Sequence, residues 1–123
     1  MSLNNVFTNE QSIDEIKTIA KGDILIVDFG EGYGHEVSGV RPALVINSTF
    51  KNPNSATIIV APITANPKKL VLDTPLHIKL SLKKESVASF ELIQAIDKAR
   101  IERRIGRLKV EYLYLIDSAL ANL

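Results

Sequence analysis

Arg41 and Thr64 are residues of this sequence whose types could do chemistry on a phosphate group. An arginine stays charged, and its planar guanidinium donates parallel hydrogen bonds to phosphate oxygens. Arg41 stands between a glycine-rich segment, residues 30–39, and an apolar run, so a fixed side chain would face a segment with unusual backbone angles. Thr64 ends a later apolar run and could present its hydroxyl to the same phosphate. The simpler alternatives are a surface salt bridge for Arg41 and a strand-end threonine for Thr64.

Cleavage of RNA is a reaction that these side chains could assist without a metal ion. The 2′-hydroxyl of the RNA attacks the neighbouring phosphate, and the protein helps to deprotonate that hydroxyl, to stabilise charge on the pentacoordinate phosphorus and to protonate the leaving 5′-oxygen. Arg41 suits the second of these tasks. A threonine hydroxyl is a poor general base, so we expect Thr64 to hydrogen-bond the phosphate.

The glycine-rich segment also holds candidate contacts to RNA bases. Tyr33 is flanked by glycines and could stack on a splayed base, whereas Phe29 ends an apolar run and is expected in the core. His35 could act as an acid or base near neutral pH, stack on a base or only contact solvent. His77 is expected on an exposed strand face, and a ribonuclease using both histidines would need them to converge. Two distant histidines without clustered carboxylates give no set of metal ligands, so no metal or other cofactor is expected.

The composition is that of an ordinary single domain. The chain has 123 residues, of which 46% are hydrophobic and 24% charged. No apolar run approaches the roughly 18 residues that cross a membrane, and the first residues lack the apolar region of a signal peptide. The absence of cysteine excludes disulfides, thiolate nucleophiles and cysteine-bound zinc. We expect a cytoplasmic protein.

Positive charge is concentrated near the C-terminal end. The formal net charge is only +1, so any binding of RNA would use a local patch. Six basic residues fall close together, and Glu102 is the one acidic residue among them. The basic residues are Lys98, Arg100, Arg103, Arg104, Arg107 and Lys109. The alternative for such a run is a solvated face with no binding role.

The first twenty residues are predicted to form a helix. Ile13, Ile16 and Ile19 recur at helical spacing. Thr8 with Gln11, three residues later, resembles a capping box. These residues are therefore predicted to form a helical N-terminal segment.

The rest of the chain reads as short strands followed by a helix. Apolar runs between turn residues predict strands at 24–29, 42–47, 57–63, 76–80 and 86–96, and a helical turn is predicted at 97–101. Leu113, Ile116 and Leu120 share one face of a C-terminal helix. No strand–helix alternation is repeated, so the order predicts a mainly β (α+β) fold, either a small antiparallel barrel or two packed sheets.

Four blocks of the sequence, in order, resemble the MazF/PemK family of toxins. They are Gly22-Asp23-Ile24 with Val27-Asp28-Phe29, the loop from Gly34 to Pro42, the strand end Ala61-Pro62-Ile63-Thr64, and the segment from Glu91 to Ile101. The resemblance covers roughly residues 21–122. It implies an SH3-like antiparallel β-barrel with a C-terminal helix, formed by a toxin domain over residues 21–123, with residues 1–20 as an extra N-terminal helical extension.

The resemblance also implies a function. Members of this family are sequence-selective, metal-independent endoribonucleases, or mRNA interferases, that cleave single-stranded RNA. Arg41 and Thr64 match the family's catalytic residues. The positions that match its RNA-binding loop are Tyr33, His35, Glu36, Ser38 and Gly39. The family forms homodimers with RNA in a groove across the subunits, and a cognate antitoxin protein occupies that groove.

Four positions depart from the family pattern. His35 replaces a serine, Ser38 a glycine, Leu92 a glutamine and Gln94 an arginine. Because the matching positions lie near the family's RNA groove, we expect these changes to alter the RNA sequence that is recognised. Two other functions stay open: a non-enzymatic toxin of the gyrase-poisoning kind on the same barrel, and an inactive RNA-binding module.

Overall fold

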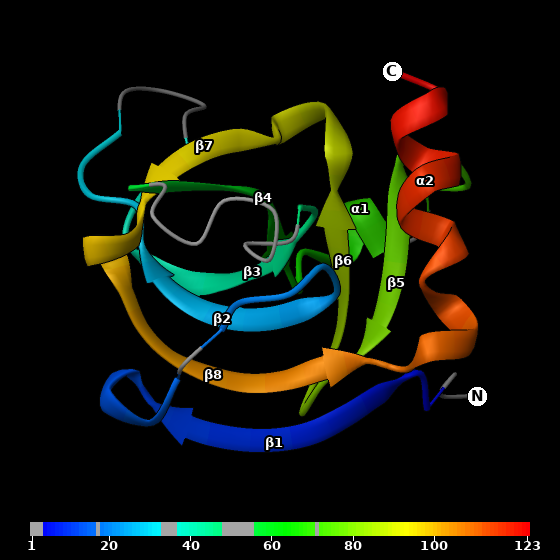
Figure 1. Cartoon of the computed structure of the whole chain (residues 1–123). Coiled ribbons are helices and arrows are strands. Elements are labelled where there is room, and N and C mark those ends of the chain that lie inside the picture. The colour runs from blue at the N-terminus through cyan, green and yellow to red at the C-terminus, as the bar shows by residue number, and fades with distance from the viewer. Residues whose placement is uncertain (1–3, 17, 33–36, 48–55, 71) are drawn as a thin grey trace.

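In the computed structural model, the chain folds into a strongly curved antiparallel β-sheet with a helix at its C-terminal end (Figure 1). The structure describes residues 4–16, 18–32, 37–47, 56–70 and 72–123. The strands are β1 (Val6–Ser12), β2 (Asp23–Asp28), β3 (Val40–Val45), β4 (Thr57–Thr64), β5 (His77–Ser81), β6 (Glu85–Ser89), β7 (Gln94–Asp97) and β8 (Ile101–Leu108). The helices are the short α1 (Pro67–Leu70) and α2 (Tyr114–Ala121), with single 3-10 turns at Ile13–Glu15, Phe90–Leu92, Lys98–Arg100 and Val110–Tyr112. None of the helices in these described ranges is long and apolar enough to span a membrane.

The strands follow the order β1-β8-β2-β3-β4-β6-β5, and β7 pairs with β4 beside this path. β4 belongs to both parts of the sheet. Its residues up to Pro62 pair with β3 and β7, whereas its last two residues, Ile63 and Thr64, pair with β6. The sheet therefore folds over along β4, and α2 lies alongside β5 on the outside of the second part (Figure 1).

Two apolar clusters hold the sheet together because its central strands are buried on both faces. Ile24 and Leu44 lie in one cluster with Ile116 of α2. Leu25 and Val45, their neighbours along the chain, lie in the other. Successive side chains of a strand point to opposite faces, so continuous apolar runs, rather than alternating ones, form β2 and β3.

The prediction of a helix in the first twenty residues is wrong. Thr8 and Gln11 lie in β1, which pairs with β8, and only a single 3-10 turn follows at Ile13–Glu15. Of the isoleucines that suggested a helix, Ile13 is 44% exposed and Ile19 is buried. The extended conformation prevails because β8 would otherwise be an open edge of the sheet, and β1 satisfies its backbone hydrogen bonds.

The expected barrel is also corrected, because the strand order has two ends, β1 and β5, and does not close. Asn5, which precedes β1 and is fully buried, connects these ends with its side chain. Its Nδ2 donates to the backbone oxygen of Lys79 at 2.8 Å, and its Oδ1 accepts from the backbone nitrogen of Ser81 at 3.0 Å. One amide side chain thus replaces the strand ladder that a closed barrel would have.

Most other predicted elements are confirmed. The strands expected at 24–29, 42–47, 57–63 and 76–80 correspond to β2, β3, β4 and β5, the turn at 97–101 to the 3-10 turn at Lys98–Arg100, and the C-terminal helix to α2. The single strand expected at 86–96 is instead β6 and β7, separated by the 3-10 turn at Phe90–Leu92. β8 was missed, because its many basic residues read as a surface.

Candidate active site

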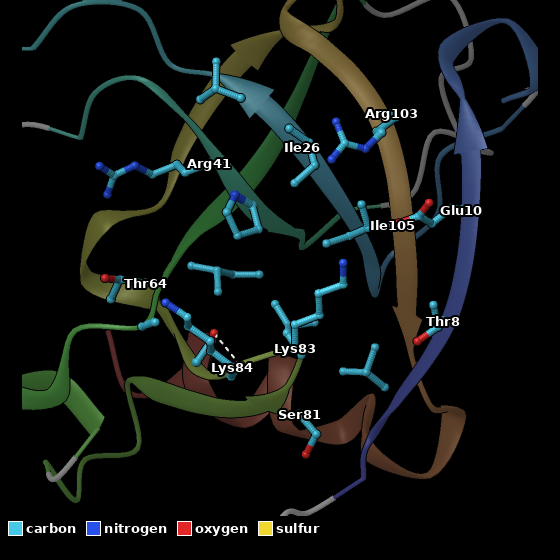
Figure 2. A pocket seen from close by; sticks show the side chains of 17 residues that line it. Thr8, Glu10, Ile26, Arg41, Thr64, Ser81, Lys83, Lys84, Arg103 and Ile105 are labelled. Carbon is cyan, nitrogen blue, oxygen red and sulfur yellow. Dashed lines mark hydrogen bonds between the residues drawn. The ribbon is translucent and has the colours of Figure 1, made fainter.

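A hollow with a volume of about 730 Å³, which we call the main pocket, lies against β1, β2, β3, β4 and β8 (Figure 2). Its apolar floor includes Ile26, Pro42, Ile63 and Ile105. Arg41 and Thr64 both line it, on the same side of the view in Figure 2. The structure therefore brings the two sequence-predicted catalytic residues to one pocket.

The strand register explains why Arg41 and Thr64 come to the same place. β3 and β4 pair Val45 with Val60 and Ala43 with Pro62. Continuing this register by two residues brings Arg41 level with Thr64. The ladder stops before that point, because Thr64 pairs with Val87 of β6 instead. The two residues thus stand where the strands part, and both line the main pocket.

Arg41 is half-buried, and its Nε is buried without a hydrogen-bond partner. In Figure 2 its side chain extends outward from the middle of the main pocket, on the same side as Thr64. Buried polar groups of proteins are nearly always paired, so the unpaired Nε leaves Arg41 with donor capacity that an anion could use.

Thr64 has one of its hydrogen-bonding functions in use. Its Oγ1 accepts a hydrogen bond from the backbone nitrogen of Asn66 at 3.1 Å. A hydroxyl can accept and also donate, so the O–H of Thr64 stays available for a phosphate oxygen. This geometry suits a donor, which is the role that its chemistry favours.

The glycine-rich loop is pinned where it joins the sheet. The backbone nitrogen of Gly39 donates to the oxygen of Gly30 at 2.7 Å, and both glycines have φ of +75°, a conformation that favours glycine. Arg100 donates from Nη1 to the backbone oxygen of Asp28 at 3.2 Å and lies against Gly30. The loop base is therefore fixed one residue before β3 begins, close to Arg41.

Of the predicted RNA-binding residues, Tyr33, His35 and Glu36 lie outside the described residues. Ser38 is half-buried and Gly39 is exposed, and neither is among the described residues that line the main pocket. Leu92, which is half-buried, and Gln94, which is exposed at the start of β7, are also not among the described residues that line the main pocket.

The charged residues of the pocket include three that the sequence did not single out, namely Lys83, Lys84 and Glu10. Four basic side chains line it, namely Arg41, Lys83, Lys84 and Arg103. Among the described residues, its one acidic lining side chain is Glu10, from β1. The excess of positive charge suits a polyanion. Lys83 and Lys84 fall in the turn between β5 and β6, where their sequence is that of any solvated turn.

The basic cluster of β8 divides between two roles. Arg103 lines the main pocket, whereas Arg104 and Arg107 form ion pairs with the fully buried Asp23, at 3.0 and 2.9 Å. Arg104 also donates to the side chain of Gln11 in β1. Neither a uniform binding patch nor a solvated face describes this strand. The register of β8 against β2 shifts between Arg104 and Gly106, so simple alternation does not hold across the strand.

His77 differs from expectation. Its side chain is only 5% exposed, and its Nε2 lies 3.0 and 3.1 Å from the two carboxylate oxygens of Glu91. The prediction of an exposed strand face is wrong, because the turn carrying Glu91 covers this end of β5. His77 lines a smaller pocket beside Leu115 of α2 and is not among the described residues of the main pocket.

Comparisons with known proteins identify relatives. The family model described as "PemK-like, MazF-like toxin of type II toxin-antitoxin system" matches residues 20–123. Endoribonuclease EndoA of Bacillus subtilis (strain 168) is 37% identical over 107 residues, which are 83% of this chain and 90% of the relative.

Solved structures show the same fold. MazF from Deinococcus radiodurans aligns with a TM-score of 0.67 at 21% identity, covering 85% of this chain and 94% of that one. An endoribonuclease from Mycobacterial species in complex with its cognate antitoxin aligns with a TM-score of 0.63 at 16% identity, covering 85% and 92%. The family match starts at residue 20, so it leaves out β1.

Proposed function

Because the chain belongs to the PemK-like, MazF-like toxins of type II toxin-antitoxin systems, we propose that it is an endoribonuclease whose reaction centre contains Arg41 and Thr64. The observation that carries this proposal is the meeting of these two residues at the parting of β3 and β4, in a pocket with an excess of positive charge.

Each residue has a defined role in this proposal. Single-stranded RNA binds in the main pocket, and its 2′-hydroxyl attacks the adjacent phosphate. Arg41 donates to the phosphate oxygens, on which negative charge increases in the transition state. Thr64 donates its hydroxyl hydrogen to the same group. The reaction uses no metal ion and leaves a 2′,3′-cyclic phosphate. His35 stays a candidate for the proton transfers.

The partners of the chain follow from its relatives. We infer a cognate antitoxin, since a structural neighbour was solved with its own, and the positive pocket suits an acidic antitoxin segment. A homodimer with an RNA groove across both subunits, and the sequence selectivity of the cleavage, belong to the same proposal.

The test is incubation of the purified protein with a long RNA in EDTA. We expect cleavage with 2′,3′-cyclic phosphate ends, and a loss of about a hundredfold or more in Arg41→Ala. Arg41→Lys keeps the charge but loses the planar fork, so it should recover only part of the rate. Cleavage that needs Mg²⁺, or that persists in Arg41→Ala, would contradict the mechanism. Intact RNA together with inhibited DNA supercoiling would favour a gyrase poison.

A further inference from the structure

β1 forms one wall of the main pocket, although it lies outside the part of the chain that matches the family. Val6, Thr8 and Glu10 alternate along the strand and all line the pocket. Phe7, between them, points to the other side and is 59% exposed. Figure 2 shows Thr8 and Glu10 on the side opposite Arg41 and Thr64. The pocket thus has a wall that the family match does not account for.

This wall is an integral part of the fold. β1 pairs along β8, Asn5 joins it to β5, and the side chain of Gln11 accepts from the buried Arg104. β1 also passes so close to Gly106 that a Cβ there would lie 2.8 Å from the backbone oxygen of Phe7. A strand held at so many points presents its side chains at fixed positions.

Glu10 is the unusual member of the wall. It is exposed, and within the described part of the chain it forms no hydrogen bond or ion pair. It is an acid in a pocket whose other charged lining residues are basic. A carboxylate repels phosphate, so it keeps the sugar-phosphate backbone off β1 and on the basic side chains that line the rest of the pocket. What faces β1 is then the base of a nucleotide.

The chemistry of a carboxylate selects among the bases. Single-stranded RNA exposes the Watson–Crick edges of its bases to protein side chains. A carboxylate has two acceptor oxygens and no donor. Guanine offers two adjacent N–H donors on this edge, at N1 and N2, whereas adenine and cytosine place a donor beside an acceptor. Ile105 of the floor gives an apolar surface beside Glu10.

We propose that β1 and Glu10 form a guanine-selective subsite next to the reaction centre. The proposal rests on the proposed function, since it assigns a base preference to the RNA that Arg41 and Thr64 cleave. The carboxylate of Glu10 accepts from N1–H and N2–H of a guanine that flanks the cleaved bond. Arg103, which also lines the pocket, binds a phosphate of the same strand.

The first experiment maps cleavage sites on a long RNA by sequencing the product ends. Wild-type protein should show guanine enriched at one position near the cleaved bond. Glu10→Gln should lower that enrichment by about fivefold or more. The matched control is Glu102→Gln, which removes the same charge from an exposed residue of β8 outside the pocket, and it should retain the wild-type pattern. Thermal unfolding checks that both variants fold.

The second experiment uses a short RNA with guanine or inosine at the enriched position. Inosine keeps N1–H and lacks the 2-amino group, so it should slow single-turnover cleavage by the wild type about fivefold and leave Glu10→Gln unaffected. RNA without guanine at this position should be cleaved at least as fast by Glu10→Gln as by the wild type, because the repulsion of phosphate is removed.

The outcomes separate the two proposals. A wild-type protein that cuts no RNA overturns the proposed function itself. Cleavage without guanine enrichment, or with an enrichment that Glu10→Gln retains, overturns the subsite and leaves the ribonuclease intact. If Glu10→Gln changes only the binding of the antitoxin, β1 faces that protein instead of RNA, and the subsite is wrong.

Discussion

Arg41 of β3 comes level with Thr64 of β4 at the point where β4 leaves β3 and pairs with β6. A continuous ladder would have filled the space between these residues with backbone hydrogen bonds. Where the strands part, both residues line the main pocket. A rigid sheet on each side holds them in place, and such preorganised donors stabilise charge that develops in a transition state.

Thr64→Val removes the hydroxyl while keeping the shape of the side chain. The buried Ile63 and the pairing with β6 should preserve the strand. The variant loses the hydrogen bond to the reacting phosphate and the one that Thr64 Oγ1 accepts from the backbone nitrogen of Asn66. We expect single-turnover cleavage to fall by about a hundredfold. Thr64→Ser keeps the hydroxyl and should stay within a few-fold of the wild type. Equal losses in both variants would mean that the methyl group of Thr64 matters more than its hydroxyl.

Asn5→Ala should destabilise the protein, because it leaves the backbone groups of Lys79 and Ser81 without the bonds that Asn5 gives them. Unpaired buried polar groups cost about 1–3 kcal/mol each, so we expect the free energy of unfolding in urea to fall by about 2 kcal/mol. Asn9→Ala, in the same strand but exposed, is the control. A change of the same size in both variants would show that the loss comes from β1 generally and not from the link to β5.

The ion pair of Asp23 with Arg104 should contribute far more to the free energy of unfolding than its ion pair with Arg107. The side chain of Arg104 is 6% exposed and that of Arg107 is 49% exposed, while Asp23 is fully buried. Breaking a buried pair costs about 3–5 kcal/mol, whereas an exposed partner contributes about 1 kcal/mol or less. Urea unfolding of Arg104→Met and Arg107→Met measures this difference. Double-mutant cycles with Asp23→Asn measure the coupling free energy between Asp23 and each arginine. We expect a large coupling with Arg104 and a small one with Arg107. Couplings of similar size would contradict the stronger role of Arg104.

The sequence predicted the centre of the fold well and its edges poorly. The strands of continuous apolar residues were found because burial on both faces leaves a simple pattern. β8 was missed, since its arginines have two different roles that only the paired strands define. Arg103 lines the pocket, whereas Arg104 and Arg107 bind Asp23. β1 was mistaken for a helix, because Ile13, Ile16 and Ile19, which follow it, recur at helical spacing. Nothing in that spacing reveals that β1 pairs with the edge of β8.

The candidate site was also predictable only in part, because contacts between residues distant in sequence place some of its side chains. Arg41 and Thr64 were found because family motifs contain them, and the register then explained their meeting. Glu10 could not be found, because an exposed glutamate in a polar segment has no sequence signal. His77 was misplaced because Glu91, fourteen positions later, covers it. Contacts between residues distant in sequence decide such cases.

Arg103 should contribute a phosphate contact that appears in the salt dependence of RNA binding. Each phosphate neutralised on a single strand adds about 0.7 to the slope of log affinity against log salt concentration. With a 2′-O-methyl RNA, which binds without being cut, Arg103→Ala should lower this slope by about 0.7. Lys79→Ala removes the same charge from an exposed side chain of β5 outside the main pocket, so it should leave the slope unchanged. If both variants lower the slope equally, RNA responds to the overall charge of the protein rather than to a phosphate site at Arg103.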